Sequence, residues 1–211
     1  ITAECGHTVD SVAALLDAAR VKLHAARARR VRPARDDKVL TAWNALMIRG
    51  LAVSGRLLAE PGHIAAATQA LDFLRAHCWR DGQLFAAWKD GRARFPAYLD
   101  DHAFLLDALL ELLQARWRSA DLDFARAIAD LLLERFQDRE RGGFWFTAEG
   151  QDPPLGRSRS FADEAMPSGN GVAALALARL GWLLGESRYL DAAAATLRSG
   201  SASLERAPQA H

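Results

Sequence analysis

The sequence predicts an all-α fold, specifically part of an (α/α) toroid, in which inner helices form a ring that outer helices surround. Three observations indicate this fold class. Helical segments that are apolar on nearly every side alternate with segments that carry a single apolar stripe. Long loops precede the apolar segments, whereas short turns follow them. The whole unit repeats at intervals of roughly 60 residues, which is typical of an array of helical hairpins.

The predicted outer helices bury one face and expose the other to water. In the first of them the buried stripe would consist of Val12, Leu15, Leu16 and Leu23. The four segments with this pattern are residues 9–29, 63–79, 122–136 and 187–198.

The predicted inner helices must be covered on both sides, because few polar residues interrupt their apolar surface. The last of them, for example, carries Arg179 as its single charge. The three segments with this pattern are residues 39–58, 101–116 and 171–184, so that about seven helices are expected in all.

Two long loops, residues 80–100 and 137–170, each connect an outer helix to the next inner helix. Each contains a run of glycine and aromatic residues, at 81–85 (DGQLF) and 142–147 (GGFWFT). Such runs favour short β-hairpins. We therefore predict two hairpins over the same end of the ring.

The composition argues against several functional classes. Lys and Arg number 27 and Asp and Glu 26 among 211 residues, so no net charge attracts nucleic acid or an anionic membrane. No apolar run is long enough to span a membrane. Cys5 and Cys78 are too far apart for a redox or zinc motif, and their scarcity favours a reducing, cytoplasmic setting. The histidine spacing fits no metal site, and we expect neither a metal nor a cofactor.

A polar cluster marks the start of each predicted inner helix, and the parallel helices of a ring would bring all three clusters to one mouth. Carboxylates, amides, an imidazole and indole faces together are typical of a sugar-binding pocket. The catalytic candidates are Asp37, Asp101, His102 and Asp163, and the substrate-binding candidates are Trp43, Asn44, Asp100, Trp145, Ser168 and Asn170.

The same residues have a structural alternative, since Asp, Ser and Asn are the favoured caps of helix N-termini. A lone histidine such as His102 is more often a hydrogen-bonding group than a general base. Asp100 and Asp101 are adjacent, so their side chains diverge. A working carboxylate pair would therefore have to combine two different clusters.

Four segments resemble the spermatogenesis-associated protein 20 family, also called YyaL-like: residues 36–44 (DDKVLTAWN), 98–104 (YLDDHAF), 142–147 (GGFWFT) and 167–170 (PSGN). The resemblance covers nearly the whole chain. It implies a toroid of the six-hairpin glycosidase type, similar to sugar epimerases, with a thioredoxin-like domain before it. Residues 1–211 would then form one partial toroid domain, with the true start of the protein upstream of Ile1 and further hairpins after His211. His102 stands where the family commonly has Tyr, and the fold's sugar epimerases use two histidines where this chain offers one.

Our leading hypothesis is therefore a carbohydrate-active or carbohydrate-binding toroid, with a sugar hydrolase or isomerase as its enzymatic form. The alternative is a non-catalytic scaffold that binds a partner for the thioredoxin-like domain. Because seven helices cannot close a ring of twelve, we also expect the chain to self-associate through an exposed inner face.

Overall fold

The computed structural model describes residues 6–151, 153 and 156–210, and the chain divides into two compact units, Ile1–Asp37 and Lys38–His211. In the first unit, helix α1 spans Val9–Ala28, close to the predicted limits. Thr8 caps this helix by accepting a hydrogen bond from the Ser11 amide at 3.2 Å. No residue of α1 is buried, so its apolar stripe has no cover within this unit. The assignment of the entire chain to one toroid domain stays a prediction.

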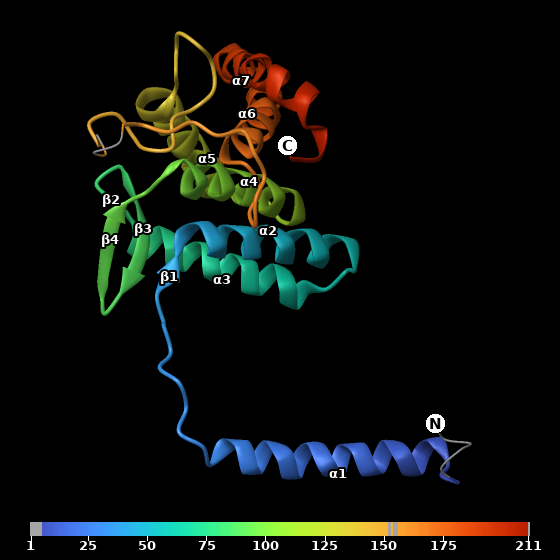
Figure 1. Ribbon diagram of the computed structural model, residues 1–211. Coiled ribbons are helices and arrows are strands. Elements are labelled where there is room, and N and C mark those ends of the chain that lie inside the picture. The colour runs from blue at the N-terminus through green and yellow to red at the C-terminus, as the bar shows by residue number, and fades with distance from the viewer. Residues whose placement is uncertain (1–5, 152, 154–155, 211) are drawn as a thin grey trace. The chain divides into compact units, whose positions relative to one another are not determined.

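The second unit consists of three helical hairpins and a small sheet (Figure 1). The first hairpin joins α2 (Thr41–Leu57) to α3 (Pro61–Cys78), and the second joins α4 (Leu99–Ala115) to α5 (Ser119–Leu131). A π-helical turn, η1 (Leu132–Phe136), extends α5. The third hairpin joins α6 (Gly169–Leu184) to α7 (Ser187–Arg206), and a 3-10 turn, η2, follows at Pro208–Ala210.

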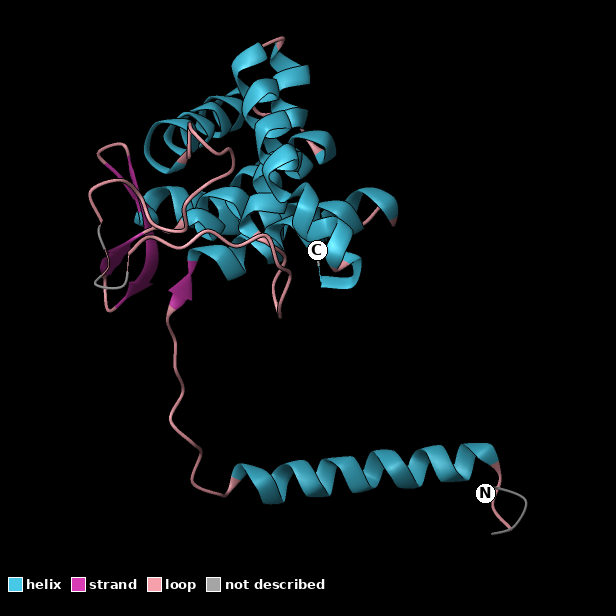
Figure 2. Cartoon of the chain, turned by 45° about the horizontal axis from the view of Figure 1, so that its top comes forward, coloured by secondary structure: helices cyan, strands magenta, loops and turns pink. Residues whose placement is uncertain are grey.

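The first helix of each hairpin packs against the first helix of the next, and the second helix packs on its own partner. Helix α4 thus lies between α2 and α6, while α3, α5 and α7 contact α2, α4 and α6 respectively (Figures 1 and 2). This is the arrangement of inner and outer helices predicted for an (α/α) toroid. The fold class is therefore confirmed, with three hairpins of the ring present.

The three inner helices differ in how completely they are buried. Every residue of α4 from Asp101 to Leu113 is buried, because α4 has a neighbour on each side. Helices α2 and α6 stand at the two ends of the row, and each leaves large apolar side chains in solvent. Trp43 and Met47 of α2 are 62% and 63% exposed, and Trp182 of α6 is 79% exposed. The prediction that the inner helices are buried on both sides thus holds for α4 and is wrong for α2 and α6.

The loop after α3 forms the predicted hairpin, from β3 (Gln83–Lys89) and β4 (Arg92–Pro96). Two short strands, β1 (Val39–Leu40) and β2 (Trp79–Arg80), also pair antiparallel with β3. The strand β1 occupies the two positions at which sequence periodicity had started the second helix. The pair β1–β3 attaches the sheet to the start of α2.

The second predicted hairpin, in the loop after α5, is wrong in its extent. Within the described part of this loop one antiparallel bridge forms, between Gln137 and Phe144. Its hydrogen bonds run from the Asp138 amide to the Gly143 carbonyl and from the Trp145 amide to the Phe136 carbonyl, so the amide and carbonyl of Phe144 face away from Gln137 and pair with the Asn170 side chain at 2.7 and 3.0 Å. The pairing is bounded on one side by η1, which ends at Phe136, and on the other by a turn in which the Gly142 amide donates to the Asp138 carbonyl at 2.9 Å.

Candidate functional site

The starts of α2, α4 and α6 lie together, and Asp101 joins the first two of them. One carboxylate oxygen of Asp101 accepts from the Ala42 amide at the start of α2, at 2.9 Å. The other accepts from the Tyr98 amide at the start of α4, also at 2.9 Å, which makes a capping box. Asp101 is 5% exposed, and burial raises its pKa to about 6. The geometry therefore gives Asp101 a positioning role at the junction of two helices.

The start of α6 approaches the start of α4 through a glycine. A side chain at Gly169 would overlap a carboxylate oxygen of Asp100 and the side chain of Leu99. The absence of a Cβ at this position lets the two helix starts come close and leaves Asp100 between them. All three polar clusters were predicted to meet in this region, and those of α4 and α6 do meet.

A cleft of about 250 Å³ opens at this junction, and we call it the Asp100 cleft. One wall is the first turn of α4, and the other is the loop that leads into α6. The polar and aromatic residues lining it are Asp100, Phe146, Ser158, Ser160, Glu164 and Ser168. The cleft combines two carboxylates, three hydroxyls and one aromatic ring, which is chemistry suited to a small polyhydroxylated ligand.

Asp100 differs from Asp101 in its polar contacts. Among the described residues its carboxylate makes no hydrogen bond and no ion pair, although it is half-buried. Burial raises its pKa above the ordinary value for aspartate. A carboxyl group that is desolvated, unpaired and open to a cleft is suited to proton transfer.

The aromatic part of the cleft is held by stacking. The rings of Tyr98 and Phe146 are nearly parallel, with centroids 4.9 Å apart. The Phe146 carbonyl also accepts from the Leu99 amide at 2.9 Å, which fixes the loop along the start of α4. Phe146 therefore presents an oriented, partly exposed ring beside Asp100.

Three of the predicted site residues shape the loop that carries the cleft. Ser168 caps α6 by accepting from the Gly171 amide, and Asp163 accepts from the Ser168 amide at 2.7 Å. Asn170 is fully buried, and its side-chain amide forms hydrogen bonds with the backbone of Phe144 and Ser160. Of these residues, Ser168 also lines the Asp100 cleft, whereas Asp163 and Asn170 line a separate hollow against α7.

The remaining predicted residues lie elsewhere. The amide of Asn44 donates to the Leu40 carbonyl at 2.8 Å, and Trp43 is largely exposed on α2. Trp145 lies beside the guanidinium groups of Arg157 and Arg159, at 5.3 and 5.7 Å from the ring centroid. Asp37 belongs to the first unit, which is not placed relative to the second, so its prediction has no structural test.

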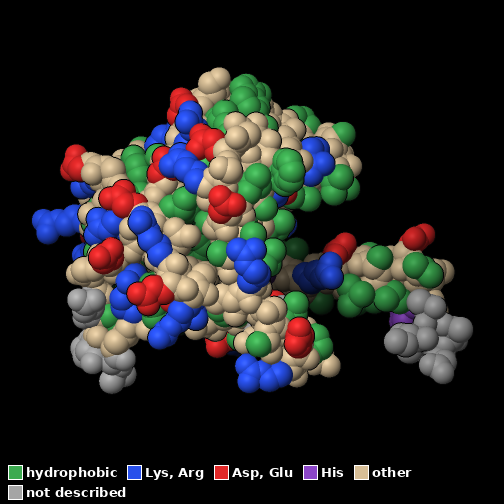
Figure 3. Space-filling view, turned by 90° about the horizontal axis from the view of Figure 1, so that it is seen from above, with side chains coloured by type: hydrophobic (Ala, Val, Ile, Leu, Met, Phe, Trp, Pro, Cys, Tyr) green, Lys and Arg blue, Asp and Glu red, His purple; other side chains and the backbone are tan. Residues whose placement is uncertain are grey.

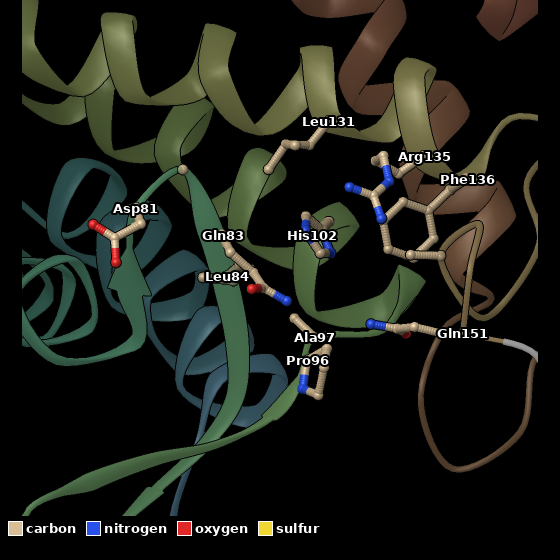
Figure 4. Close-up of a pocket in the computed structure, with 12 residues that line it drawn as sticks. Asp81, Gln83, Leu84, Pro96, Ala97, His102, Leu131, Arg135, Phe136 and Gln151 are labelled. Atoms are coloured by element: carbon tan, nitrogen blue, oxygen red, sulfur yellow. The ribbon is translucent and has the colours of Figure 1, made fainter.

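His102 lines a second cavity (Figure 4), and Asp100 is not among the residues that line it. Successive helical residues are rotated by about 100°, so the side chains of residues i and i+2 point in nearly opposite directions. The structure therefore separates His102 from the Asp100 cleft, although both belong to one cluster in the sequence.

Beyond the Asp100 cleft, α4 continues its polar face with two buried acids. Asp107 accepts from Arg49 of α2 at 2.6 Å and from Arg179 of α6 at 2.7 Å. Glu111 pairs with Arg179 at 2.9 Å and with Arg56 at 3.4 Å. These ion pairs join the three inner helices on the face that Asp100 begins, because positions seven and eleven residues apart share one helix face.

Two cleft residues were missed as individual candidates, Glu164 and Phe146. Glu164 adjoins Asp163 in the third polar cluster, and Phe146 belongs to the glycine-aromatic run. Both signals were visible in the sequence, but only the folded loop shows which member of each pair faces the cleft.

No helix within the described ranges has the length and apolar character needed to cross a membrane. On the face of the second unit seen in Figure 3, positive and negative side chains are interspersed, and hydrophobic groups gather toward the top and right of the view.

Solved structures that resemble this fold include enzymes that act on sugars. Cellobiose 2-epimerase from Spirochaeta thermophila has a TM-score of 0.63 and 20% identity, over 77% of this chain and 43% of that one. A family 76 α-mannanase from Bacteroides thetaiotaomicron has a TM-score of 0.65 and 15% identity, over 82% and 47%. An inactive α-1,6-mannanase variant from Salegentibacter, in complex with α-1,6-mannotriose, has a TM-score of 0.62 and 17% identity, over 76% and 46%.

No protein-family model matches the sequence, but curated proteins do. Spermatogenesis-associated protein 20 from rat and from human are each 34% identical over 220 aligned residues, which include 99% of this chain. The chain spans 28% of the length of these relatives. With this identity over nearly its full length and a toroid-type fold, the chain belongs to the spermatogenesis-associated protein 20 family, as a segment within the length of its curated members.

Proposed function

We propose that the Asp100 cleft binds a sugar and that the toroid to which it belongs is carbohydrate-active. The observation that carries the proposal is the state of Asp100, which is half-buried, has no described polar partner and faces a cleft. Folding exposes the carboxyl group to the cleft while withdrawing it from bulk water, which costs stability. Such a cost is common at sites of binding and proton transfer.

The lining of the cleft suits both recognition and chemistry of a sugar. Phe146 offers a flat apolar surface for one face of a pyranose ring, and Ser158 and Ser160 offer hydroxyl groups. Burial raises the pKa of Asp100 and so shifts this carboxyl group toward its protonated form, which is the form that a general acid needs. Glu164, from a different polar cluster, supplies the second carboxylate that glycoside hydrolysis or proton exchange would use.

The solved neighbours give independent support. They include a sugar epimerase, an α-mannanase and a mannotriose complex. The inactive mannanase has two consecutive aspartates replaced by asparagine, and Asp100 and Asp101 are one of the two such pairs in the present chain. In our proposal the two residues have different roles: Asp100 contacts the sugar, and Asp101 positions α4, the helix that carries Asp100.

Thermal denaturation with a panel of monosaccharides and disaccharides tests the proposal. A sugar present at ten times its dissociation constant stabilises the native state by about 1.4 kcal/mol, which corresponds to roughly 3–6 °C for a chain of this size. We expect at least one sugar to produce this shift in the wild-type chain. Asp100→Asn should abolish the shift, and the matched control Asp123→Asn, on the exposed side of α5, should keep it.

The test also separates the enzymatic proposal from the scaffold alternative. Absence of any shift across the panel would contradict a sugar site and favour a partner-binding toroid. For a sugar that does bind, proton NMR of the mixture over time would reveal hydrolysis or isomerisation. Turnover lost in both Asp100→Asn and Glu164→Gln would support catalysis by the cleft.

A further inference from the structure

The cavity beside His102 is a second pocket, distinct from the Asp100 cleft, with a volume of about 250 Å³. It lies between the β2–β3 turn, the first turn of α4, η1 and the loop around Ala148 (Figure 4). Leu84, Leu131 and Phe136 supply apolar walls. The volume is below the roughly 300–1,000 Å³ of pockets for drug-sized ligands, so it suits a molecule of monosaccharide size.

The chemistry of His102 is fixed by its one hydrogen bond. Its Nδ1 lies 2.8 Å from the Tyr98 carbonyl oxygen. A carbonyl oxygen can only accept, so Nδ1 carries the proton and Nε2 carries a lone pair. The Phe136 ring, 4.8 Å away, packs against the imidazole, and burial lowers the pKa of His102 to about 4.

The Nε2 lone pair has no partner among the described residues, although His102 is only 3% exposed. Its imidazole faces the cavity in Figure 4. Nε2 is not among the fully buried, unpartnered side-chain atoms of the described residues, so it is open to the cavity. In the cavity, His102 Nε2 can therefore accept a hydrogen bond from a ligand.

The other polar groups that face the cavity are one guanidinium group, which only donates, and two amides, which both donate and accept. Arg135 donates to the Glu149 carbonyl at 3.0 Å and forms no ion pair within the described part of the chain. In Figure 4 its guanidinium extends toward the cavity, as do the amides of Gln83 and Gln151. Asp81 also borders the cavity, but its carboxylate points away. The inward-facing charge is therefore positive.

We propose that this cavity binds a small hydroxylated carboxylate, such as a sugar acid, with a hydroxyl group donating to His102 Nε2 and the carboxylate accepting from Arg135. The amides of Gln83 and Gln151 complete the contacts with the remaining hydroxyls. This site is additional to the sugar-binding cleft at Asp100, and it would let the toroid recognise an acidic sugar independently of that cleft.

Titration calorimetry with D-glucuronate tests the proposal, with D-glucose as the probe that lacks the carboxylate. We expect glucuronate to bind in the millimolar range and glucose to bind at least tenfold more weakly, because one charge-assisted hydrogen bond accounts for about a factor of ten. Arg135→Gln and His102→Phe should each weaken glucuronate binding about tenfold. The matched control Arg139→Gln, an exposed arginine outside the cavity, should bind as the wild type does.

Two further variants keep the outcome decisive. Should His102→Phe fail to fold, Gln83→Ala changes an exposed residue at the cavity edge and should weaken binding several-fold. Wild-type affinity in both Arg135→Gln and Gln83→Ala would overturn the proposal, as would no measurable glucuronate binding. A loss of binding in Asp100→Asn with no loss in Arg135→Gln would place the sugar acid in the Asp100 cleft and would also overturn it.

Discussion

Replacing Asp107 with alanine should lower the free energy of unfolding by about 2–3 kcal/mol, because this carboxylate ties together all three inner helices. Asp107 is 3% exposed and accepts one hydrogen bond from Arg49 of α2 and one from Arg179 of α6. Each charge-assisted hydrogen bond contributes roughly 1.5–3 kcal/mol, so the two together set an upper limit of about 3–6 kcal/mol. Much of this is not realised, for two reasons that the structure supplies.

The first reason is solvent: the Arg49 and Arg179 side chains are 44% and 26% exposed, so water can solvate them once the acid is gone. The second is that Arg179 keeps a second partner, Glu111, at 2.9 Å. The larger penalty of about 3–5 kcal/mol, found when one member of a fully buried pair is removed, therefore does not apply.

Urea unfolding followed by far-UV circular dichroism and tryptophan fluorescence measures the change in stability. Asp123→Ala, which removes an exposed acid from α5, is the matched control and should alter stability by less than about 0.5 kcal/mol. Double-mutant cycles of Asp107→Ala with Arg49→Ala and with Arg179→Ala should each give a coupling energy of about 1 kcal/mol or more. A stability loss for Asp107→Ala equal to that of the control would refute the idea that these ion pairs hold the inner helices.

Three further predictions concern pH, the long loop and the exposed helix faces. The folded-state pKa of Asp101, about 6, lies above its ordinary value, and that of His102, about 4, lies below its own. Between pH 4 and 6 the folded state binds the proton of Asp101 more tightly than the unfolded state does, so this group makes the free energy of unfolding fall as pH rises. For His102 the unfolded state binds the proton more tightly, so this group makes the free energy of unfolding increase with pH. The urea midpoint of Asp101→Asn should therefore increase with pH more steeply than that of the wild type. Asn170→Ala removes three hydrogen bonds, two of them buried, and should lower the free energy of unfolding by about 2–4 kcal/mol. Hydrogen exchange at the Phe144 amide should become faster, and an unchanged exchange rate would refute the role of Asn170 in the loop. Light scattering should show self-association of the chain that Trp182→Ser weakens, and a wild-type monomer at all concentrations would refute it.

The ring arrangement could be read from the sequence because burial imposes a pattern over many residues. Helix α4 has a neighbour on every side, and its sequence is correspondingly apolar from Phe104 to Leu113 apart from Asp107 and Glu111. Those two acids were not assigned a partner, because the arginines that pair with them come from helices 55 or more residues away. Long-range pairing of this kind leaves no local signal in a single sequence.

The candidate site was predictable in its region and less so in its residues. Periodicity locates the helix starts, and hence the polar clusters that gather at Asp100. Periodicity does not show whether a polar side chain hydrogen-bonds to the backbone, as those of Asp101 and Asn170 do, or faces a cleft. That choice depends on loop geometry, and the same is true of Glu164 and Phe146, which reach the cleft only because the loop before α6 folds back over α4.

A crystal structure of the chain soaked with the sugar that stabilises it most would show directly whether the Asp100 cleft binds sugar. We expect electron density in the cleft, with the sugar ring against Phe146 and a hydroxyl or glycosidic oxygen within hydrogen-bond distance, about 2.6–3.2 Å, of the Asp100 carboxylate. Well-ordered sugar bound elsewhere, with the cleft holding water alone, would contradict it.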